Sequence, residues 1–215
     1  MRDSDKRLPL LQGIKICRKV WIQGSFGAAG EDAVVAVPVI ICKGDVRDTG
    51  DVVPELKSMS VEKVREWLEA RGFADRMTVH EGTIDTVEHA AIQVGASEAE
   101  IAKTLSFMVD EKPVIVVMAG DARVNSSKFK AQFHTKPHMI PRDMVEELTG
   151  FAPGGVCPFA IPADIPIWLD VSMKRFGHVH PAGGSEYVSV DLTPEELEEA
   201  SEAAGWCDVC AGWEN

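Results

Sequence analysis

One lysine of this chain stands where its charge can be held in place. Lys103 lies inside the run Ile101–Phe107 (IAKTLSF), where a helical pattern gives way to a strand pattern. The apolar residues around it favour burial, so we expect Lys103 at the edge of the core. A lysine anchored there is a point charge with three donors and suits an anionic group such as a phosphate. The alternative is a lysine that buries its methylenes and keeps its ammonium group in solvent.

A glycine pair followed by a proline is the second feature that could do chemistry. Gly154 and Gly155 precede Val156, Cys157 and Pro158. Backbone N–H groups can approach a developing negative charge where no side chain intervenes, which is what an oxyanion requires. Gly-Gly next to Pro is also typical of a plain tight turn. Nothing in the sequence lowers the pKa of Cys157, so we expect this thiol to pack or to line a pocket.

The remaining polar candidates are single residues near predicted strands. A lone histidine such as His80 is more often a surface or a satisfied core residue than a base. His178 and His180 alternate along a predicted strand and share a face, but two histidines without a third ligand make a weak metal site, so no metal is predicted. Asp170 ends a strand, where it either orients a substrate amine or caps a turn.

Capping residues and periodicity predict the scaffold from Met59 onward. Helices are predicted over 59–68, 86–94, 97–102, 126–133 and 141–148 and from Thr193 onward, and strands over 77–80, 104–109, 113–119, 167–170, 179–180 and 187–190. Strands and helices mix without strict βαβ alternation, which favours a mixed sheet over a doubly wound parallel one.

The composition is that of an ordinary soluble globular protein, with 215 residues, 45% hydrophobic and 26% charged. The sequence has no apolar run of ~18 residues and no secretory signal pattern at its start, so we expect a cytoplasmic protein without a membrane partner. Five irregularly spaced cysteines argue against a disulfide framework. The pair Cys207 and Cys210 lacks the further ligands that a structural zinc site needs.

Three motifs in order carry a resemblance. The segments KTLSF (103–107), AGDARVNSSK (119–128) and TGFAPGGVCPF (149–159) resemble the YbaK/ProX family of aminoacyl-tRNA editing domains. This family includes free-standing deacylases and the insertion domain of bacterial prolyl-tRNA synthetases. The resemblance covers roughly Met59 to Asp208 and implies a mixed α/β fold with a curved, barrel-like sheet and flanking helices. We therefore expect an editing domain over 59–215, and residues 1–58 to be a loose extension or a mis-assigned start.

The resemblance also implies roles for particular residues. Lys103 matches the family's lysine, which is needed for deacylation and is taken to hold phosphate or the ribose end of the substrate. Gly154 and Pro158 match the ends of the family's glycine-x-x-x-proline loop, so catalytic roles are expected of Lys103, Gly154 and Gly155. Substrate binding is expected of Pro158, Gly120, Asp121, His80, Thr83, Asp170, Gly183 and Gly184.

The implied activity is trans-acting hydrolysis of the ester at the 3′ aminoacyl end of a mischarged tRNA. The substrate's own vicinal hydroxyl would assist the water, no cofactor is expected, and prolyl-tRNA synthetase is a candidate partner. A non-catalytic adaptor that binds a tRNA end or a synthetase is the alternative, although an intact lysine and loop favour the enzyme. Neither G-x-G-x-x-G nor a P-loop supports a nucleotide-binding protein.

The net charge of −12 opposes tight binding of a polyanion, whose affinity comes from lysine and arginine. Many of the acidic residues lie in the last predicted helix and just after it, where a run of charge is typical of a solvated helix face. The basic residues fall in the segments that would build the site: Lys103, Arg123, Lys128, Lys130, Lys136, Arg142, Lys174 and Arg175. The charge therefore does not exclude recognition of a tRNA end.

Overall fold

The computed structural model describes residues 59–214, and the predictions made for residues 1–58 lie outside this range. Its α-helices are α1 (Met59–Glu69), α2 (Val87–Val94), α3 (Ser126–Phe133), α4 (Val145–Thr149) and α5 (Pro194–Ser201). Short 3₁₀ turns are η2 (Ala74–Arg76), η3 (Glu98–Glu100) and η4 (Val171–Arg175). Within this range, no helix has both the length and the apolar character needed to span a membrane.

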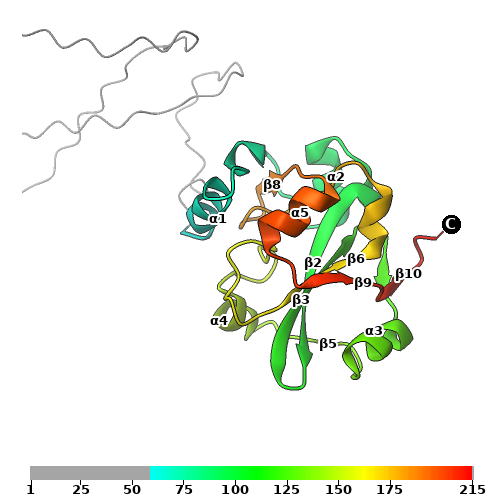
Figure 1. Ribbon diagram of the computed structural model, residues 1–215. Helices are drawn as coiled ribbons and strands as arrows, with labels where there is room; N and C mark the ends of the chain where they lie inside the picture. The colour runs from blue at the N-terminus through cyan, green and yellow to red at the C-terminus, as the bar shows by residue number, and fades with distance from the viewer. Residues whose placement is uncertain (1–58, 215) are drawn as a thin grey trace, which may run out of the picture. The chain divides into compact units, whose positions relative to one another are not determined.

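The strands are short apart from one central hairpin, β2 (Ile101–Val109) with β3 (Lys112–Ala119). The others are β1 (Met77–Val79), β4 (Arg123–Val124), β5 (His138–Met139), β6 (Ile167–Asp170), β7 (His180–Pro181), β8 (Val188–Val190), β9 (Gly205–Cys207) and β10 (Cys210–Ala211). Figure 1 shows the long hairpin with α2 and α5 near one end and α3 near the other.

The main sheet is mixed, as predicted. Its strand order is β5-β2-β3-β6-β9, with β7 also beside β2. The β2–β3 and β2–β5 pairs are antiparallel, whereas β3–β6, β6–β9 and β2–β7 are parallel. Among the described residues β5 and β9 remain separate ends of an open path, so the barrel-like closure implied by the resemblance is not confirmed.

The core forms around β3, in which every residue from Val114 to Ala119 is buried. A strand buried on both faces reads as a continuous apolar run, and this one does. The helix α1 packs Val61, Val64 and Leu68 inward, and each of these side chains is fully buried. The strand β3 therefore anchors the hairpin that carries Lys103 in the core.

Side-chain caps begin three of the helices. Thr86 caps α2 by accepting a hydrogen bond from the N–H of His89 at 3.1 Å, and Gly95 ends that helix in the left-handed region. Asn125 caps α3. Thr193 forms a complete capping box at the start of α5.

Two predicted helices need correction. Ser97 does form a capping box, but the helix it opens is only the single turn η3, and β2 already begins at Ile101. Ile101 pairs with His180 of β7, and this sheet contact outweighs the local helical signal. Lys103 is therefore the third residue of a strand and not a junction residue. The helix predicted over 141–148 begins only at Val145.

Candidate active site

The strand β2 has a complete partner on one edge and an interrupted one on the other. Along the first edge β3 pairs with it from Ala102 to Val109. Along the second edge β7 pairs with 101–102 and β5 pairs with 107–108. Within residues 59–214, positions 103–106 thus have no strand partner on the second edge. This gap opens onto a cavity.

The cavity has a volume of about 370 Å³ and draws its walls from five separate parts of the chain. They are the start of α2 with the turn before it, the gap in β2, the segment around β5 and α4, the loop 153–156, and β7. Most of its lining is apolar, and its polar side chains are Asp85, Thr86, Lys103, Thr104, Ser106, Arg142 and His180. An apolar cleft with a few convergent polar groups is typical of a small-ligand site.

Lys103 lies at the wall of this cavity with its ammonium group tethered. Nζ donates hydrogen bonds to the carbonyl oxygens of Gly120 at 2.9 Å and Ala122 at 2.5 Å, in the turn after β3. Burial lowers the pKa of Lys103 from its ordinary value. The same side chain also borders a second, more open hollow of about 350 Å³ that includes Arg123 and Met139. Lys103 is thus a positioned cation shared by two concave surfaces.

The glycine loop reaches the cavity through Gly154, flanked there by Pro153 and Val156. Gly154 has φ +100°, a backbone conformation that L side chains rarely adopt, and a Cβ added to it would meet no atom within 4 Å. The N–H of Gly155 already donates to the carbonyl of Ala152 at 2.9 Å. The N–H of Gly155 is therefore engaged within its own turn.

Two further residues of this loop are buried and do not line the cavity. Pro158 is buried in the loop's second half. Cys157 is fully buried, and burial raises the pKa of its thiol to about 12. A thiol of that pKa is not a thiolate at neutral pH, so the packing role predicted for Cys157 agrees with its position.

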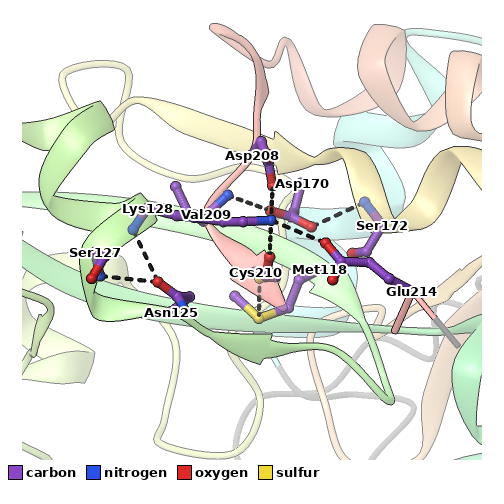
Figure 2. A network of polar contacts seen from close by, with 10 residues as sticks. All are labelled: Met118, Asn125, Ser127, Lys128, Asp170, Ser172, Asp208, Val209, Cys210 and Glu214. Carbon is purple, nitrogen blue, oxygen red and sulfur yellow. Dashed lines mark hydrogen bonds and ion pairs between the residues drawn. The ribbon is translucent and has the colours of Figure 1, made fainter. Parts of the chain in front are cut away.

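Asp170 lies away from both cavities and is fully buried. Its carboxylate accepts the N–H of Ser172 at 3.0 Å and the N–H of Val209 at 2.9 Å. Figure 2 shows the carboxylate between these two backbone segments. The geometry matches the turn-capping alternative, because the two N–H groups belong to η4 and to the turn between β9 and β10.

We expect Asp170→Ala to destabilise the protein strongly. The substitution leaves two buried N–H groups without an acceptor, and each such group costs about 1–3 kcal/mol. The free energy of unfolding in urea should therefore fall by about 2 kcal/mol or more, whereas Asp164→Ala at an exposed position should change it by less than about 0.5 kcal/mol. Equal stability of the two variants would contradict a capping role for Asp170.

The turn between β9 and β10 carries the C-x-x-C pair. Lys128 of α3 holds this turn by donating to Asp208 at 2.9 Å and to the carbonyl of Cys210 at 2.9 Å (Figure 2). Cys207 and Cys210 are free and buried, and burial raises the pKa of both thiols. The pair therefore contributes to packing, and Lys128 to its attachment.

Among the other predicted substrate-binding residues, two polar side chains have partners outside the cavity. His80 joins β1 to β8 through a 2.7 Å contact between Nε2 and the Ser189 hydroxyl, and burial lowers the pKa of this histidine. Asp121 forms an ion pair with Arg175. Thr83 does not line the cavity but precedes Ile84, which does.

The three predicted strand-end glycines allow close packing of backbone. A Cβ on Gly120 would lie 1.9 Å from the Glu98 carbonyl oxygen, and one on Gly184 would lie 2.8 Å from the Ser60 carbonyl oxygen. Gly183 donates its N–H to the carbonyl of Val188 at 2.6 Å. Of the eleven residues predicted for the site, the cavity thus brings together Lys103 and Gly154.

Several cavity residues were not predicted as part of the site. His180 is the most notable, since its Nδ1 lies 3.9 Å from the carboxylate of Asp191 and burial lowers its pKa. Thr104 and Ser106 stand within the KTLSF motif itself, so alternation along a strand was the signal that could have identified them. No group of three or more His, Cys, Asp or Glu side chains within 59–214 is placed to hold a metal ion.

The comparisons with known proteins include the segments that line the cavity. The model of the aminoacyl-tRNA editing domain matches residues 81–200. The chain is 41% identical over 157 residues to the uncharacterized protein YwhH of Bacillus subtilis (strain 168), over 73% of this chain and 100% of that one. It is 25% identical over 114 residues to EbsC of Enterococcus faecalis (strain ATCC 700802 / V583), named as a candidate Cys-tRNA(Pro)/Cys-tRNA(Cys) deacylase, over 52% of this chain and 70% of that one. The solved structure of a candidate trans-editing enzyme for prolyl tRNA synthetase superposes with a TM-score of 0.66 at 29% identity, over 72% of this chain and 99% of that one.

Proposed function

Because the chain belongs to the aminoacyl-tRNA editing domain family, we propose that it is a trans-acting deacylase that hydrolyses the ester of mischarged tRNA. The observation that carries the proposal is the cavity itself. An anchored cation, Lys103, and an open glycine, Gly154, both border one apolar cleft. The relatives named for deacylation and for trans-editing support the same reaction class.

Hydrolysis of an aminoacyl ester needs a placed water, stabilisation of the oxyanion, and a pocket for the amino acid. In this proposal Lys103 holds the ribose or phosphate end of the terminal nucleotide as a fixed point charge. Gly154 leaves room for the ester beside the loop. The vicinal hydroxyl of the ribose assists the water, which agrees with a buried, protonated Cys157 that cannot act as nucleophile. The apolar walls accept the amino-acid side chain.

The test is release of free amino acid by the purified full chain. A panel of tRNAs carrying noncognate cysteine, alanine, serine or threonine should include at least one substrate that is hydrolysed well above its spontaneous rate. The same panel is run with prolyl-tRNA synthetase present, since a partner would supply affinity for tRNA to an acidic chain. Binding of tRNA without release under both conditions would favour the adaptor and overturn the proposal.

A further inference from the structure

The gap in β2 directs the backbone of Thr104 toward the cavity. In an antiparallel ladder the N–H and C=O of a residue point to the same side, and this direction alternates along the strand. The carbonyl of Ser106 accepts the N–H of Ile140 at 3.0 Å, which fixes its direction toward the β5 edge. Thr104 lies two residues earlier and therefore directs its N–H and C=O to the same edge. That edge has no strand partner at Thr104 within the described part of the chain.

We propose that Thr104 binds the aminoacyl group of the substrate through its backbone. Its C=O accepts a hydrogen bond from the substrate's α-ammonium group, and its N–H donates to the ester carbonyl. An aminoacyl ester carries a donor and an acceptor on either side of one Cα, as a residue in a strand does. The pairing is then a single-residue version of adding a strand to a free sheet edge. This inference rests on the proposed function and names the group of the substrate that the site recognises.

The position of the cavity supports this pairing. The gap at 103–106 lines the cavity over its whole length, with Gly154 and Val156 of the glycine loop also at the wall. The N–H of Gly155 is already used within its turn, so the N–H of Thr104 supplies the oxyanion contact that this loop residue does not. A donor aimed at the ester carbonyl strengthens its bond as negative charge develops on that oxygen.

One consequence concerns the substrates that the site rejects. The C=O of Thr104 is an acceptor and needs a donor opposite it. A free α-ammonium group meets that need with a charge-assisted hydrogen bond. An N-acylated amino group has lost its charge and carries extra bulk toward the strand. The protein should therefore hydrolyse aminoacyl esters with a free α-ammonium group and leave N-acylated esters intact.

The experiment changes the substrate by one group. Alanyl-tRNA is compared with lactyl-tRNA, in which a hydroxyl replaces the ammonium group, and each enzymatic rate is divided by the spontaneous rate of the same ester. The full chain should accelerate the lactyl ester about tenfold less, because a neutral hydroxyl donates a weaker hydrogen bond to the Thr104 C=O than a charged ammonium group does. Equal acceleration of the two esters would overturn the role of Thr104.

A binding measurement separates this inference from the proposed function. Stable 3′-amide analogues of alanyl- and lactyl-adenosine are titrated into the protein, and the alanyl analogue should bind about tenfold tighter. If the protein shows this binding preference but hydrolyses no ester, the proposed deacylase activity is wrong and the proposed role of Thr104 in binding stands. If the protein hydrolyses the ester but shows no preference for the alanyl form in rate or in binding, the deacylase activity stands and the proposed role of Thr104 is wrong.

The donor itself is tested by replacing one backbone atom. The variant Thr104→Val is compared with a protein that carries the α-hydroxy analogue of valine at the same position, so that an ester oxygen replaces the N–H. Turnover of alanyl-tRNA should fall about tenfold or more between these two proteins. Equal turnover in two proteins with equal melting temperatures would show that this N–H does not contact the reacting carbonyl.

Discussion

Lys103→Ala is expected to lower kcat/KM for deacylation at least about tenfold while the protein stays folded. The ammonium group is fixed at the cavity wall by two carbonyl oxygens, so it offers a substrate a charge that is already positioned. Loss of a contact between a charged donor and an anionic group costs about 1.5–3 kcal/mol, which corresponds to tenfold or more in rate. The measurement is amino-acid release from the tRNA that the panel identifies as substrate.

Two companion variants separate charge from packing. Lys103→Met keeps most of the side chain's methylene packing and removes the charge, so it should lose as much activity as Lys103→Ala. Lys112→Ala removes an exposed lysine near the other end of the hairpin and should leave the rate within about twofold, since surface changes stay near 0.5 kcal/mol. Full turnover in a folded Lys103→Met protein would show that the charge of Lys103 has no role in the reaction.

Gly154→Val is the second change expected to have a large effect, a loss of about 10²-fold or more in activity. At φ +100° a β-branched residue is strained, and a Cβ built there meets no protein atom within 4 Å. Because Gly154 lines the cavity, we expect the valine side chain to obstruct the substrate there. The expected loss is of the size that removal of one oxyanion-hole donor causes in other enzymes, about 10²–10³ in rate. Kinetics must be paired with a melting curve, because strain at this φ also lowers stability.

Gly72→Val provides the matched control. Gly72 has φ +81°, and a Cβ there also meets nothing within 4 Å, but it follows α1 and does not line the cavity. The two variants should lose similar stability because both force a β-branched residue into the left-handed region. If the activity of both variants falls only in proportion to the fraction of protein that is folded, the loop is a structural turn and Gly154 has no part in the site.

Local chemistry made much of the scaffold predictable. Thr86 and Thr193 cap helices where the sequence places them, because a cap depends on residues no more than a turn away. The apolar run of β3 predicted a buried strand because a strand buried on both faces has apolar residues at every position, a pattern that is visible within a few residues. The mixed character of the sheet followed from the order of these elements.

Candidate residues at strand ends were less predictable. Asp170 and the three glycines stand where a chain either turns or meets a ligand, and the sequence does not distinguish these cases. The choice depends on which distant backbone lies opposite: Val209 for Asp170, Glu98 for Gly120 and Ser60 for Gly184. Such contacts join segments that are far apart in the chain, and no local pattern encodes them.

By itself the sequence determined most of the longer elements, the caps at Thr86 and Thr193, and the two motif residues that border the cavity, Lys103 and Gly154. The tertiary structure alone decided that a cavity exists between them. It exists because β7 and β5 pair with the two ends of one edge of β2 and leave its middle free. β5 and β7 follow β2 in the chain by about 30 and 80 residues, respectively, and join it through main-chain hydrogen bonds, which depend little on side-chain identity. A gap in a ladder therefore has no residue signature, and only the assembled sheet reveals it.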